Sequence, residues 1–135
     1  MPANTTPIFP KTPKLSWGNI LTANTAVDGT GTVVAVFTAG ANGSRLDTIK
    51  CRSLGTNVAT VIRVFLNNGL TNATAANNTL YMETTLPATT LSQVAALADI
   101  EIVMDLVLPA GYVVNITIGT TVAAGYQVAA VGGDY

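Results

Sequence analysis

Short runs of β-branched and apolar residues, separated at intervals of about ten residues by Gly, Asn and Pro, most strongly constrain the fold of this chain. The run TVVAVFT at 32–38 follows the turn cluster DGTG at 28–31, and the run at 57–66 ends at NNG at 67–69. Asn and Gly tolerate the positive φ that tight turns require. Seven or eight such strands with almost no helix predict an all-β fold, a single β-sandwich of the jelly-roll type.

Side-chain alternation indicates how individual strands are buried. The run at 57–66 is apolar on both faces, which predicts a central strand. The run at 99–106 places Ile and Met at even positions facing inward and Asp99, Glu101 and Asp105 outward, as in a half-buried strand. Further strands are expected at 45–53, 79–85, 112–118 and 121–131.

Two intervening segments have a different character. The stretch 70–78 carries small polar residues after Leu70, which predicts a surface loop. The tetrad TLSQ at 90–93 fits a capping box ahead of Val94 to Leu97, which predicts one or two helical turns.

The first 17 residues contain four prolines, which exclude helix and any central strand. We therefore expect an extended, Pro-rich N-terminal arm over 1–17, followed by the sandwich domain over 18–135. A disordered terminus is the alternative, but large apolar side chains stabilise a protein only when they are buried. The arm is thus expected to dock on a partner, with the candidate contact residues Pro7, Ile8, Phe9, Pro10, Leu15 and Trp17.

Charge is scarce in this 135-residue chain. Only 10% of its residues are charged, against about a quarter in ordinary domains, and the net charge is −1. With a mean hydropathy of +0.46, the chain is expected to cover part of its surface with other copies of itself. The same balance predicts no nucleic-acid partner, because no basic field is present.

The apolar stretch 100–118 is interrupted by Glu101, Asp105, Pro109 and Gly111, so we expect no membrane span. The first residues lack the basic and continuously apolar character of a secretory signal. The chain is therefore expected to fold where it is made, and Cys51 to be a reduced thiol.

Catalytic chemistry has few candidates. The chain has no His, the most frequent general base and metal ligand. Asp99, Glu101 and Asp105 share one strand face and could bind a cation, but a solvated strand face is favoured. Cys51 alternates with Ile49 and is expected in the core, and no serine-hydrolase motif is present. We predict a protein that is not an enzyme, with no catalytic, cofactor or metal residues.

The basic and aromatic residues leave alternatives open. Arg63, with Lys50 and Arg52 of the preceding strand, predicts a small cationic patch across neighbouring strands. It would pair either with acidic residues of another subunit or with carboxylates of the same chain. Tyr112 is expected in the core. The other aromatic residues are assigned to packing or a subunit contact, in preference to a carbohydrate platform.

Several phrases occur in a distinctive order: LTANTAVDGTGTV at 21–33, FTAGANGSR at 37–45, GTNVAT at 55–60, LPAGY at 108–112 and GGDY at 132–135. In this order the chain resembles small structural proteins of tailed bacteriophages and prophages. The resemblance implies a virion component made in the bacterial cytoplasm. Its implied role is a head decoration (cement) protein, commonly a homotrimer, bound to the major capsid protein without any cofactor. The alternatives are a receptor- or carbohydrate-binding module of a tail fibre or spike, and a tail or baseplate subunit.

Overall fold

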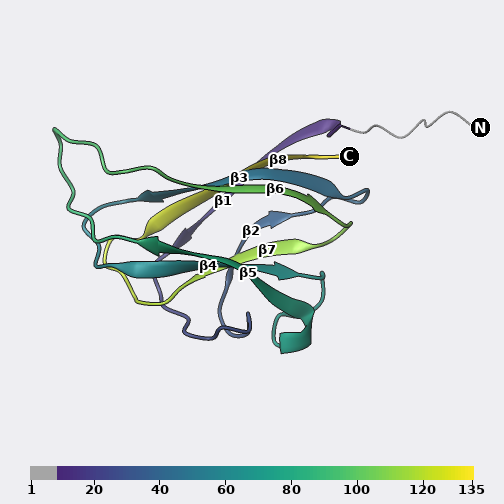
Figure 1. Ribbon diagram of the computed structural model, residues 1–135, viewed down its shortest axis with the longest axis horizontal. Coiled ribbons are helices and arrows are strands. Elements are labelled where there is room, and N and C mark those ends of the chain that lie inside the picture. Colours follow the sequence, from purple (N-terminus) through teal and green to yellow (C-terminus); the bar gives the residue numbers. More distant parts are fainter. Residues whose placement is uncertain (1–8) are drawn as a thin grey trace, which may run out of the picture.

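Two four-stranded antiparallel sheets, packed face to face, form the body of the protein (Figure 1). The computed structural model describes residues 9–135, so Pro7 and Ile8 lie outside the described residues. One sheet has the order β1-β8-β3-β6 and the other β2-β7-β4-β5. The strands are β1 (Thr12–Ile20), β2 (Val34–Thr38), β3 (Ser44–Ser53), β4 (Thr60–Asn67), β5 (Asn78–Leu86), β6 (Ile100–Leu108), β7 (Val113–Ile118) and β8 (Tyr126–Asp134). The predicted all-β sandwich is confirmed.

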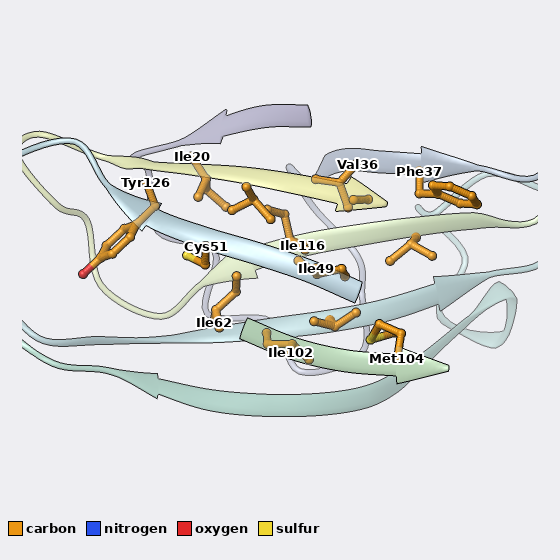
Figure 2. Packing of buried hydrophobic residues seen from close by; sticks show 14 of the residues in the cluster. Ile20, Val36, Phe37, Ile49, Cys51, Ile62, Ile102, Met104, Ile116 and Tyr126 are labelled. Carbon is orange, nitrogen blue, oxygen red and sulfur yellow. The ribbon is translucent and has the colours of Figure 1, made fainter. Parts of the chain in front are cut away.

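The core lies between the two sheets and is built from the inward positions of nearly every strand (Figure 2). Cys51 and Ile49 of β3 are both fully buried there, as their alternation predicts. Full burial of an aliphatic side chain such as that of Ile49 stabilises the fold by about 1.5–3 kcal/mol. Tyr112 is half-buried and packs against the edge of this cluster.

Strand β4 lies between β7 and β5, which confirms the prediction of a central strand. Its register against β5 shifts between Val64 and Phe65. Both side chains are fully buried, but only Val64 belongs to the core cluster between the sheets. Phe65 therefore points away from the core and is covered from the other side of its sheet.

The segment Thr12–Trp17, which the sequence assigns to the arm, forms the first part of the edge strand β1. Proline lacks a backbone N–H and is therefore tolerated in an edge strand, which has no partner strand on one side. Strand β1 is such an edge strand, because it pairs only with β8, and it contains Pro13. Two side chains tie β1 to the neighbouring sheet: Ser16 Oγ donates to the Val36 carbonyl, and Lys14 Nζ donates to the Thr38 carbonyl.

The predicted helical turns after Thr90 are absent. Ser92 Oγ accepts hydrogen bonds from the N–H groups of Val94 (3.2 Å) and Ala95 (3.1 Å), as an N-cap does, yet the chain continues as a loop. A helical nucleus costs free energy that packing must offset, and Val94 is 98% exposed. Within residues 9–135 the helical element is a single 3₁₀ turn, Ala75–Asn77, inside the segment predicted as a surface loop.

Candidate functional site: an uncovered sheet face

The outer faces of the two sheets differ in what covers them. The segment 21–33 runs below the β2-β7-β4-β5 sheet in Figure 1. The N–H of Asn24 donates to the Ile118 carbonyl (2.9 Å) at one end of this segment. Near its other end, Asn72 Nδ2 donates to the Gly31 carbonyl (2.8 Å) and Asn78 Nδ2 to the Asp28 carbonyl (3.2 Å). The chain thus fastens its own loop across this sheet.

Burial confirms that this outer face is closed. Phe65, Asn115 and Thr117 are each at most 5% exposed, although none of them belongs to the core cluster. A strand residue that points away from the core is this inaccessible to solvent only when another segment of the chain covers it. The middle of this outer face is therefore closed, whereas Leu80 and Tyr81 of the edge strand β5 stay 38% and 45% exposed.

The β1-β8-β3-β6 sheet has an open outer face. The strand register places Leu15, Val131, Thr48 and Val103 in one row across all four strands. Leu15 is 60% exposed, Val131 41% and Val103 69%. We call the set Leu15, Trp17, Val103, Val107, Ala129 and Val131 the apolar face. Contiguous exposed apolar residues with a polar rim are typical of interaction sites.

A shallow hollow of about 350 Å³ lies on this sheet, lined by Trp17, Lys50, Arg52, Gln127 and Ala129. The hollow arises in the row of residues next to the row of Leu15, Val131, Thr48 and Val103, which we call the aliphatic row. In this neighbouring row Ala129 lies between Trp17 and Lys50. A small residue between two long side chains leaves a depression. Trp17 is 63% exposed and forms one wall of the hollow.

Most of the charges beside the apolar face are paired within the chain. Arg45 bonds both Asp47 (2.7 Å, Nε to Oδ1) and Asp105, and Arg52 bonds Asp99. The hydrogen bond from Arg52 lowers the pKa of Asp99 below its ordinary value. Asp99, just before β6, and Asp105, within β6, thus act as ion-pair partners. No metal-binding group of three or more side chains occurs within residues 9–135.

The predicted patch of Arg63 with Lys50 and Arg52 is wrong. Lys50 and Arg52 lie in β3 and Arg63 in β4, and these strands belong to different sheets. Arg63 instead pairs with Glu83 of the adjacent strand, with Nε 2.7 Å from Oε1. Of the two pairings left open, the one within the chain is observed for Arg52 and Arg63.

Two groups that resemble nucleophiles are held in structural roles. Burial raises the pKa of the Cys51 thiol to about 12, which keeps it protonated near neutral pH. The buried Ser44 hydroxyl donates to the Asp134 carboxylate, which also accepts from Lys14 Nζ at 3.2 Å. Ser44, Lys14 and Asp134 therefore join β1, β3 and the end of β8.

The sequence identified part of this surface. Of the predicted contact residues, Leu15 and Trp17 lie on the apolar face, and Phe9 is exposed ahead of β1. Val103, Val107, Ala129 and Val131 were missed. For Val103 and Val107 a sequence signal was available: both are valines at outward positions of the run 99–107, which they share with the outward carboxylates Glu101 and Asp105.

Comparison with family models, curated proteins and solved structures finds no match to this chain. Within residues 9–135 no helix has the length and apolar character needed to cross a bilayer. The fold and the site define a β-sandwich with one sheet face closed by its own loop and the other open. The function is therefore inferred from the chemistry of the open face.

Proposed function

We propose that this chain is a phage virion structural protein, a head decoration (cement) protein that binds the major capsid protein and stabilises the shell by adhesion. The observation that carries the proposal is the apolar face, an open sheet surface suited to contact with other protein subunits of an assembly, whereas the chain closes the middle of the opposite sheet. The low charge content supports it, because a sparsely charged surface suits contact with other subunits.

We also propose that the sandwich is a jelly roll. Successive strands from β1 to β8 alternate between the two sheets, and only β4 and β5 are consecutive strands of the same sheet. Eight strands wound in this way between two antiparallel sheets support that architecture.

Adhesion to a lattice does not need strong individual contacts. Many identical subunits on one shell bind with avidity, which multiplies modest affinities by about 10²–10⁴ when the geometry allows simultaneous engagement. In this proposal the residues before β1 provide contacts to the shell, since Phe9 is exposed next to the end of the sandwich.

The test is cosedimentation with purified phage shells that lack their decoration protein. Removal of residues 1–8 is the appropriate truncation, because β1 begins at Thr12 and every strand is retained. The full chain should sediment with the shells, and the truncated chain should fold but bind at least tenfold more weakly. Full-length chain that stays in the supernatant at saturating concentration would refute the decoration role.

One observation favours a second candidate, a carbohydrate-binding module of a tail fibre or spike. The hollow presents an exposed Trp17 ring beside Lys50, Arg52 and Gln127, and a sugar can stack on such a ring and accept hydrogen bonds from such neighbours. A glycan array separates the candidates: specific binding that Trp17→Ala abolishes would favour the module. Locating the chain in an imaged virion distinguishes both from a tail or baseplate subunit.

A further inference from the structure

We infer that the apolar face is the binding site for a second copy of this chain, sheet against sheet. This inference deepens the proposed function by naming the surface through which copies join. In this contact the β1-β8-β3-β6 sheet of one copy packs face to face on the same sheet of the other copy, about 10 Å apart. Stacked sheets within one domain have the same spacing.

The area of the face reaches the lower limit for a specific pair. Strands lie about 4.8 Å apart and rise about 3.3 Å per residue, so four strands of about nine residues present about 570 Å². Two such faces in contact bury about 1,100 Å², and specific interfaces start at about 1,000 Å².

The charge of the sheet also fits a copy of itself. A two-fold contact brings the same patch together twice, so a patch of one sign would repel its partner. Here three cations and four anions lie on β3 and at β6, which leaves one net negative charge; they are Arg45, Lys50, Arg52, Asp47, Asp99, Glu101 and Asp105. Arg45 and Arg52 are already neutralised by carboxylates of their own chain.

The aliphatic row argues for a protein surface in preference to a polar ligand. Leu15, Val131 and Val103 offer no hydrogen-bonding side-chain atoms, and Thr48 is the single hydroxyl of that row. A sugar would leave its hydroxyls without partners there, which costs free energy. The hollow over Ala129 gives a side chain of the second copy a place to insert.

The contact closes at two copies because each copy uses the same surface. The resemblance to phage decoration proteins implies a trimer instead, which would require two different surfaces. Mass in solution therefore tests the inference directly.

The experiment follows mass and fluorescence of the full chain over a concentration series. Sedimentation equilibrium should show a rise from 13.8 kDa to twice that mass. Trp17 is the sole tryptophan of the chain and lies on the apolar face. Its emission should shift to shorter wavelength over the same concentration range, because pairing buries the ring.

Matched variants locate the contact. Val103→Lys and, separately, Leu15→Lys should weaken pairing at least tenfold and keep the emission at its monomer wavelength. Val27→Lys is the control: Val27 is 62% exposed, like Val103, but lies in the loop beyond the other sheet. It should pair as the parent chain does, and circular dichroism should show the same fold for all three.

Several results would overturn the inference: a mass of one copy at every concentration, a mass of three copies, or pairing that leaves Trp17 emission unchanged. Pairing lost in Val27→Lys and retained in Val103→Lys would do the same. Shell cosedimentation is a separate readout, so failure of the decoration role and failure of pairing are distinguishable.

Discussion

Asn57 makes a specific prediction about stability, because its buried amide joins three segments of the chain. Its Nδ2 donates to Ser53 Oγ and to the Gly125 carbonyl, both at 2.9 Å. Its Oδ1 accepts from the N–H groups of Ala124 (2.8 Å) and Gly125 (3.1 Å). Its backbone also forms an isolated bridge with Thr89.

The substitution Asn57→Ala removes all four side-chain hydrogen bonds at a site that is 3% exposed. Each bond contributes about 1 kcal/mol net, and a buried N–H left without a partner, as at Gly125, costs about 1–3 kcal/mol. Because loop relaxation recovers part of this, we expect a loss of about 3–5 kcal/mol in the free energy of unfolding. That loss corresponds to about 10–20 °C in Tm for a domain of this size.

Urea denaturation at one fixed protein concentration measures the loss, with Asn42→Ala as the control. Asn42 is exposed, and its amide makes one long hydrogen bond of 3.5 Å to the Tyr135 carbonyl. The control should therefore stay within about 0.5 kcal/mol of the parent chain. A loss below about 1 kcal/mol in Asn57→Ala, or equal losses in the two variants, would refute the role given to this amide.

Two further predictions concern titratable groups. Because Cys51 is fully buried and its pKa is raised to about 12, a thiol reagent at neutral pH should label it only after denaturant unfolds the chain; rapid labelling of the native chain would contradict this. The hydrogen bond from Ser44, followed by the contact with Lys14, lowers the pKa of Asp134 below its ordinary value of 3.8. The folded state therefore binds a proton at Asp134 less readily than the unfolded state does. The stabilisation that ionised Asp134 contributes is complete above its ordinary pKa and is lost as the pH falls through its lowered pKa. Urea denaturation between about pH 6 and pH 2 should show a shallower loss for Asp134→Asn than for the parent chain, and identical slopes would count against the assignment.

Most strands were predictable because their signals are local. Turn residues such as Gly43 and Gly69 adopt positive φ where the sequence predicts chain reversals. The sequence analysis did not predict strand β1, because proline is excluded from central strands. Pro13 instead lies in an edge strand, where proline is tolerated. The helical turns after Thr90 were expected from local propensity, which fails where packing is absent, as at Val94.

The sequence alone determined that this chain is β-rich, sparsely charged and without imidazole chemistry, because the residue types and the spacing of runs and turns are local properties of the chain. Only the tertiary structure decided which outward residues meet solvent. Phe65 and Val103 are both apolar residues that point away from the core, yet one is fully buried and the other 69% exposed. Segment 21–33 lies beyond the sheet that carries Phe65 (Figure 1), and its hydrogen bonds with Ile118, Asn72 and Asn78 span long stretches of sequence. Alternation along a strand separates its two faces, but what covers each face is set by contacts between distant parts of the chain.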